Sequence, residues 1–167
     1  MSESTTNQRK KDHIEIVLSK DIDDNLSVRD TYTLPYRAFP ESNLEEIDTS
    51  VQFFWKQLSF PFIISSMTGW PEKWQLINSH LAEAAEQAGV ALGLGSMRVI
   101  IEHPETLATF DVRKLCPTIP LFASVWLVQL NYGFWVDECN RIIDSIQADG
   151  LFFHINPLQE AVQPEGD

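Results

Sequence analysis

The chain has 167 residues, of which 44% are hydrophobic and 22% are charged, a composition typical of a globular protein with a buried core. Its 24 acidic side chains outnumber the 12 basic ones and give a formal charge of −12, which argues against nucleic acid as a partner because phosphate contacts need a basic surface. No apolar run is long enough to span a membrane, and the polar N-terminus lacks the apolar segment of a signal peptide, so we expect a cytoplasmic protein without a membrane partner.

The first 58 residues give only weak structural signals. Residues 1–8 are polar and predict a disordered tail, and residues 9–58 predict an irregular arm. Within the arm, Asp23-Asp24-Asn25 is a turn signal, and Ser27–Tyr36 favours a strand or hairpin. The basic run at residues 9–13 is typical of a solvated tail, and the alternative is an arm that folds over an anionic ligand.

From residue 59 onward, strand and helix patterns alternate. Four short apolar runs predict strands at Phe62–Ile64, Val90–Leu94, Ile119–Val125 and Leu151–Ile155. Between them, three segments predict helices: Lys73–Ala88, Pro104–Leu115 and Trp135–Gln147. Buried strands joined by helices imply right-handed crossovers, so this region predicts an α/β fold with a parallel sheet.

The spacing of apolar residues predicts which helix faces are buried. In the first helix one face carries Ile77, Leu81, Ala84, Ala85 and Ala88. Gly89 directly follows and is a plausible stop. In the third helix the apolar stripe is Cys139, Ile142, Ile143 and Ile146. Cys116 and Cys139 form no metal or redox motif, so we interpret both as reduced core thiols, and we interpret Trp55, Trp74 and Trp135 as packing residues.

Polar residues follow each predicted strand. The four stretches are Ser66–Gly69, Gly95–Arg98, Ser124–Trp126 with Gln129, and His154–Glu160. In a parallel α/β sheet these loops meet at the carboxyl edge, where ligands bind. A Gly-Ser pair in one such loop is usually only a turn, and a lone histidine such as His154 is usually structural, but four polar loops at one edge indicate a ligand site. Arg98 suits a diphosphate, and Glu160 suits Mg²⁺.

Several short motifs carry a resemblance to a known family over essentially the whole chain. They are Arg9-Lys10 with His13-Ile14, Ser65–Gly69, Gly95-Ser96 with Arg98, Val128–Gly133, and the stretch HINPLQEAVQPEGD from His154 to Asp167. Together they resemble the type 2 isopentenyl-diphosphate isomerases, with most likeness to cyanobacterial members. The resemblance implies a TIM barrel, of which residues 59–167 would form the first half, a partial barrel of about four parallel βα units.

The resemblance also implies an activity, its cofactors and its site residues. The family interconverts isopentenyl and dimethylallyl diphosphate, using Mg²⁺ and FMN that is reduced, commonly by NADPH. By resemblance, the residues that would contact FMN are Ser66, Met67, Thr68, Ser96 and Ser124. Those that would contact substrate are Arg9, Lys10, His13, Ser96, Arg98, Asn156 and Gln159. His154 and Gln159 would be the catalytic residues, and Glu160 would hold Mg²⁺.

Four departures from the family pattern concern the expected flavin contacts: Trp70, Met97, Ser124 and Trp126. Trp70 and Trp126 stand where the family has glycine, and a bulky indole there hinders the close approach of a flat ring. We therefore hypothesise weakened FMN binding. A barrel of eight strands needs about 250 residues, and the free edges of half a barrel favour self-association into a homo-oligomer. Two interpretations stay open: an isomerase, or a truncated or degenerate non-catalytic half-barrel that acts as a binding partner.

Overall fold

The computed structural model describes residues 12, 15–16, 18–20, 33, 35–39, 41–66 and 73–162. It divides into two compact units, Met1–Asp48 and Thr49–Asp167. In the described part of the first unit, the 3-10 helix η2 covers Leu44–Glu46, and the side chain of Asn43 accepts a hydrogen bond from the Glu45 amide at 3.2 Å. The second unit contains every strand described below.

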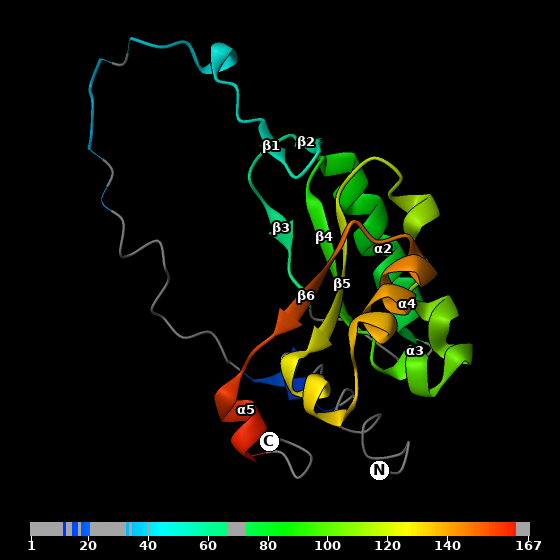
Figure 1. The fold of residues 1–167 in the computed structure, drawn as a ribbon. Coiled ribbons are helices and arrows are strands. Elements are labelled where there is room, and N and C mark those ends of the chain that lie inside the picture. Colours follow the sequence, from blue (N-terminus) through cyan, green and yellow to red (C-terminus); the bar gives the residue numbers. More distant parts are fainter. Residues whose placement is uncertain are drawn as a thin grey trace. The chain divides into compact units, whose positions relative to one another are not determined.

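A four-stranded parallel sheet forms the centre of the second unit. Its strands are β3 (Ile63–Ile64), β4 (Ala91–Ser96), β5 (Leu121–Trp126) and β6 (Gly150–His154). They pair in chain order, β3-β4-β5-β6, and every pairing is parallel (Figure 1). The predicted alternation of strands and helices and the parallel sheet are thus present, with strand bounds that shift by at most two residues.

The prediction of a partial TIM barrel is wrong. The described residues form an open sheet in which β3 and β6 each pair with a single neighbour, and a separate antiparallel pair lies outside this sheet. Alternating strands and helices determine parallel pairing and the hand of the crossovers. They do not determine closure, which requires a matching number, tilt and stagger of strands. The sequence pattern was therefore sufficient for the sheet and insufficient for a barrel.

Helices cover one face of this sheet. The α-helices are α2 (Lys73–Ala88), α3 (Val99–Glu102), α4 (Val136–Ile146) and α5 (Pro157–Val162), and the 3-10 helices are η3 (Pro104–Thr109), η4 (Arg113–Leu115) and η5 (Leu127–Tyr132). Figure 1 shows α2, α3 and α4 on the same side of the strands. We call this side the helix face. The main core lies beneath it and includes Leu92, Leu94, Leu121, Val125 and Ile142, none of them more than 1% exposed.

The prediction for α2 is confirmed in its bounds and partly in its buried face. Gly89 ends the helix with a φ of +66°, and the Val90 amide donates to the Ala85 carbonyl at 3.0 Å, which is the hydrogen bond of a Schellman motif. Ala85 is buried as predicted, but Ala84 and Ala88 are exposed. The buried face also includes Trp74, Asn78 and Ala82. Asn78 is fully buried, and its side-chain amide donates to the Thr109 carbonyl at 2.8 Å, which offsets the cost of removing the amide from water.

The predicted helix at Pro104–Leu115 is wrong. This region contains η3 and η4, preceded by the single turn of α3. Two threonine hydroxyls bond backward to the main chain: Thr106 donates to the His103 carbonyl at 2.7 Å, and Thr109 donates to the Thr106 carbonyl at 2.8 Å. Such local bonds compete with the regular hydrogen bonds of an α-helix. The apolar pattern of this region predicted a helix, but its two threonines favour short 3-10 turns.

An antiparallel hairpin covers the other face of the sheet at its amino end. Its strands are β1 (Val51–Phe53) and β2 (Lys56–Leu58), and Phe54 in the connecting loop has a φ of +54°. This hairpin was not predicted, because Phe54-Trp55 lacks the asparagine or glycine usual in such loops. The side chains of β1 and β2 form a second core cluster whose buried members are Leu58, Ala91 and Phe122, with Phe152 packed against it. We call this side of the sheet the hairpin face.

Candidate functional site

A bulge in β4 brings Ser96 onto the hairpin face, beside Ser124. Gly93 is the register partner of Phe122, whereas Ser96 is the register partner of Ser124, so three steps along β4 match two steps along β5. The extra residue shifts the alternation of β4 by one. Because Phe122 lies on the hairpin face, Ser124 two residues later lies there too, and the bulge places Ser96 beside it. Without the bulge, Ser96 would face the helices.

Ser66 lies over β4 on the same face. A Cβ atom added to Gly93 would be 2.5 Å from the Ser66 hydroxyl and 3.3 Å from the ring of Phe152. Glycine at position 93 therefore makes room for the Ser66 side chain. The Ser66 hydroxyl is buried, and it has no hydrogen-bond partner in the part of the chain that the structure describes. A buried hydroxyl without a partner is costly, which makes this atom a candidate ligand contact.

An aromatic pair lies at the carboxyl ends of β5 and β6. Trp126 and His154 are register partners, and their ring centroids are 4.4 Å apart with an interplanar angle of 78°. Trp126 lies two residues after Ser124 and therefore shares its face. The imidazole of His154 is exposed, whereas Trp126 is half-buried. The serines and this pair thus gather at the carboxyl half of the hairpin face.

The two residues that follow β4, Met97 and Arg98, differ in their burial. Arg98 precedes α3, and its guanidinium is 3.7 Å from the carboxylate of Glu102 in that helix. Its side chain is 23% exposed, so it remains accessible to an anion. Met97 is fully buried in the core beneath the helix face. The substitution at Met97 therefore lies in the core, and our interpretation of it as a change at the flavin contacts is corrected.

Other predicted site residues are described in part or not at all. Asn156 is partly buried between β6 and α5, and Gln129 is buried in η5. Gln159 and Glu160 lie in α5, which directly follows β6, but their side chains are outside the described part. The remaining predicted residues lie wholly outside it: Arg9, Lys10, His13, Met67, Thr68 and Trp70. Among the described residues, no three His, Cys, Asp or Glu side chains are grouped so that they could hold a metal ion.

Sequence reasoning missed an ionic cluster at the amino ends of the strands. The Asp149 carboxylate accepts hydrogen bonds from Lys56 at 2.9 Å, from Arg113 at 2.7 Å and from the Leu121 amide at 2.8 Å. Burial alone would raise the pKa of Asp149, but the bonds from Lys56, the Leu121 amide and Arg113 outweigh it and lower the pKa. The cluster joins the hairpin to β5 and β6. An aspartate just before the predicted strand was its only signal in the sequence.

The two cysteines differ in burial. Cys116 is fully buried in the core, and burial raises the pKa of its thiol to about 11. Cys139 is half-buried, and burial raises the pKa of its thiol as well. Neither thiol is therefore activated as a nucleophile. Trp74 packs in the core as predicted, whereas Trp55 and Trp135 are 65% and 66% exposed, contrary to the prediction of packing.

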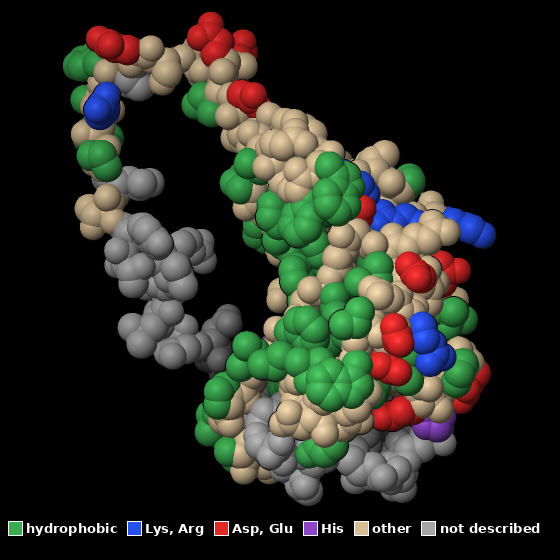
Figure 2. Space-filling model, in the orientation of Figure 1, with side chains coloured by type: hydrophobic (Ala, Val, Ile, Leu, Met, Phe, Trp, Pro, Cys, Tyr) green, Lys and Arg blue, Asp and Glu red, His purple; other side chains and the backbone are tan. Residues whose placement is uncertain are grey.

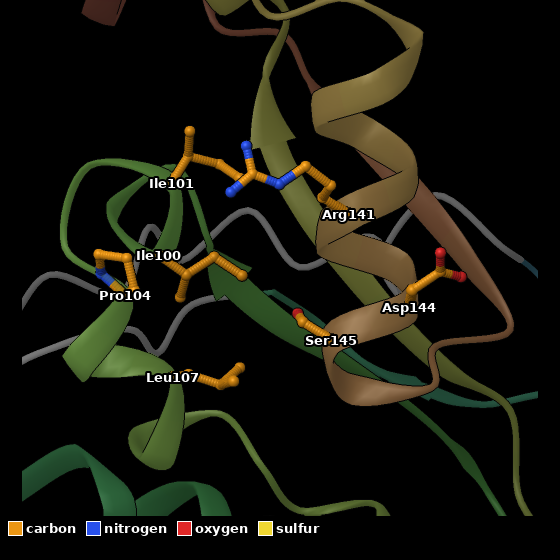
Figure 3. A pocket seen from close by; sticks show the side chains of 7 residues that line it. All are labelled: Ile100, Ile101, Pro104, Leu107, Arg141, Asp144 and Ser145. Atoms are coloured by element: carbon orange, nitrogen blue, oxygen red, sulfur yellow. The ribbon is translucent and has the colours of Figure 1, made fainter.

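A hollow of about 410 Å³ lies elsewhere, within the helix layer. It is lined by Ile100, Ile101, Pro104 and Leu107 on one side and by Arg141, Asp144 and Ser145 of α4 on the other (Figure 3). None of its lining residues belongs to the predicted site. In Figure 3 the Asp144 carboxylate points away from the hollow, and the Ser145 hydroxyl donates to the Ile142 carbonyl at 2.8 Å. The hollow is thus an apolar crevice between helices, distinct from the serines on the hairpin face.

The surface also differs between the two sides of the sheet. Figure 2 shows hydrophobic side chains over the hairpin and β6, and acidic and basic side chains over the helices. Three exposed apolar residues lie at the end of β6 and in the residues that follow it: Phe153, Ile155 and Leu158. In the part of the chain that the structure describes, no helix is long and apolar enough to cross a membrane.

Comparison with known proteins relates the chain to one named enzyme. It is 46% identical over 161 residues to isopentenyl-diphosphate delta-isomerase of Rickettsia africae, and 46% identical over 164 residues to the protein of that name from Nostoc sp.. These matches cover 96% and 97% of this chain but 47% of each relative. The chain therefore spans about half the length of the curated relatives it matches. No protein-family model matches the chain.

Proposed function

We propose that the carboxyl half of the hairpin face is part of the active site of a type 2 isopentenyl-diphosphate isomerase, which uses reduced FMN and Mg²⁺, with NADPH as reductant. Two independent facts support this proposal. The chain shares 46% identity with proteins named for this isomerisation. The residues that the motifs single out in β4, β5 and β6 lie on one face of neighbouring strands. The single observation on which the proposal depends most is the bulge that places Ser96 beside Ser124.

The flavin would lie against the serines. Ser66, Ser96 and Ser124 offer hydroxyl groups that can bond to the polar edge of a flat ring or to a phosphate. The residues fit such a group, because the Ser66 hydroxyl is buried and lacks a partner among the described residues. Met67 and Thr68 would complete these contacts. When bound and reduced, FMN supplies the acid–base group for proton transfer to and from carbon.

The substrate would lie between the serines and the β6 end of the site. The double bond of the substrate shifts along its carbon skeleton when one carbon gains a proton and another carbon loses one. Arg98 would hold the diphosphate through paired N–H donors. By resemblance His154 and Gln159 would be the catalytic residues, and the exposed His154 imidazole would also donate to a diphosphate oxygen. Asn156 and Gln159 would line the pocket, and Glu160 would bind Mg²⁺. By resemblance, Arg9, Lys10 and His13 would also contact the diphosphate.

Water must be excluded where carbon is protonated, because water competes for the proton. The hairpin face supplies apolar walls next to the serines: Phe152 contacts the position above Gly93, and Phe122 stacks on Phe152 with ring centroids 4.5 Å apart. The indole of Trp126 lies at the carboxyl end of β5, whereas Phe122 lies near its amino end. These rings would shield the reacting carbons while the diphosphate remains at the open edge.

Replacing Ser66 tests this assignment. Ser66→Ala removes a buried hydroxyl that has no partner among the described residues, so the ligand-free chain should lose no stability, and its affinity for FMN should fall. Ser145→Ala is the matched control, because Ser145 lies in the helix layer. FMN binding is measured by quenching of flavin fluorescence, and turnover is measured with isopentenyl diphosphate, Mg²⁺ and reduced FMN. Equal FMN affinity of the two variants would contradict the proposal. Turnover that needs no flavin would indicate type 1, because the relatives' names do not state a type.

A second candidate is a non-catalytic binding domain. The exposed side chains of Phe153, Ile155 and Leu158 favour it, because grouped apolar residues at a surface mark interaction sites. In this case the chain would associate with itself as a homo-oligomer and would neither bind FMN nor turn over substrate. Light scattering of the purified chain, combined with the two assays above, distinguishes the candidates. A monomer that binds FMN would exclude this second function.

A further inference from the structure

The contact between Trp126 and His154 has a geometry that can hold the histidine in place. The two residues are register partners at the ends of adjacent strands, so their backbones are fixed relative to each other by the sheet. The ring planes are inclined at 78°, with centroids 4.4 Å apart. Edge-to-face pairs of this kind are favourable and directional, because the positive edge of one ring meets the negative face of the other.

An exposed histidine normally samples several ring orientations. Its second side-chain torsion is broad, and fixing a side chain costs entropy. His154 is exposed and ends a strand at the sheet edge, so the backbone alone does not restrict its ring. The half-buried indole of Trp126 supplies the missing restriction. A ring that is already oriented binds a ligand with less loss of entropy than a mobile one.

We propose that Trp126 is a positioning residue for His154: its indole holds the imidazole at a steep angle to its own plane so that a ring nitrogen faces an anionic ligand on the hairpin face. The identity of that ligand, a diphosphate ester, rests on the proposed function. The orientation of His154 does not rest on it. Trp126 thereby has a role of its own at a position where the family resemblance leads us to expect glycine.

The test uses the full chain, labelled with ¹³C and ¹⁵N in histidine and studied by nuclear magnetic resonance. The chain has 4 histidines, and His154→Gln assigns the signals of His154. An aromatic ring displaces the signals of protons held beside it, so the His154 ring protons should be displaced from the positions of free histidine. Trp126→Phe keeps an aromatic ring and should keep most of this displacement. Trp126→Leu keeps bulk without aromaticity and should abolish it.

Binding is then measured by titration with inorganic diphosphate. We expect the dissociation constant to rise several-fold in Trp126→Leu and to stay close to the original value in Trp126→Phe, while thermal unfolding confirms that both variants fold. Undisplaced His154 signals in the unaltered chain would overturn the inference without any variant. So would a displacement that survives in Trp126→Leu. If the displacement behaves as expected but His154 does not respond to diphosphate, the positioning role stands and the proposed function fails.

Discussion

Asp149 offers the sharpest test of how the hairpin is attached to the sheet. In Asp149→Asn the amide oxygen still accepts from the Leu121 amide, so the change removes the charge that pairs with Lys56 and Arg113. The side chains of Lys56, Arg113 and Asp149 are 19%, 13% and 12% exposed. Breaking a fully buried ion pair costs about 3–5 kcal/mol, and partial exposure reduces this to roughly 2–3 kcal/mol here. The expected fall in melting temperature is roughly 5–10 °C.

The assay is thermal and urea unfolding followed by circular dichroism, with Asp144→Asn as the control. Asp144 is an exposed carboxylate on α4, so its neutralisation should change the free energy of unfolding by less than about 0.5 kcal/mol. Native contacts lower the pKa of Asp149, so its stabilisation is complete above the unfolded value of about 3.9 and is lost as pH falls through the lower native pKa. Asp149→Asn should remove this acid-side loss. Equal stability of the two variants at pH 7 would refute the reasoning.

Three further predictions follow from the packing. Gly93→Ala should destabilise the chain by about 1–3 kcal/mol in urea unfolding, because the new methyl group meets the Ser66 hydroxyl, and adding Ser66→Ala should recover part of the loss. Cys139 should react slowly with a thiol reagent at pH 8 and Cys116 only on unfolding, because its thiol is buried with a pKa of about 11; rapid reaction of both in the native chain would contradict this. Replacing Trp126 by glycine should increase the affinity for FMN in the fluorescence assay if the indole hinders the ring; unchanged affinity would remove that steric explanation.

Local sequence signals predicted the four parallel strands and the helices α2 and α4. The bounds of α2 follow from the periodic apolar residues and from Gly89, and the stripe on α4 is confirmed by the burial of Ile142 and Ile146. Strand order also follows, because short crossovers leave few topologies. These features depend on residues close together in the chain. A pattern of hydrophobicity is therefore sufficient to find them.

Features that depend on distant residues were not predictable in this way. One such feature is whether the sheet closes into a barrel or stays open. Another is the bulge in β4: the hydrophobic pattern predicted that this strand ends at Leu94, so it could not show that Ser96 pairs with Ser124. The loop of the hairpin has Phe54 at a positive φ, and it contains no asparagine or glycine from which the turn could have been predicted. Motif spacing pointed to Ser66, Ser124 and His154, and the sheet brings these to one face. Met97, which we interpreted as a departure at the flavin contacts, lies in the core.

The most direct test of the whole account is a titration with FMN of the chain labelled with ¹⁵N in serine. Single serine substitutions assign the amide signals. Ser66, which follows β3, lies on the same face of the sheet as Ser96 of β4 and Ser124 of β5. Their three signals should therefore move together and saturate with one dissociation constant. The signal of Ser145 should stay in place. Movement of Ser145 without the other three, or three unrelated responses, would contradict a single site on the hairpin face.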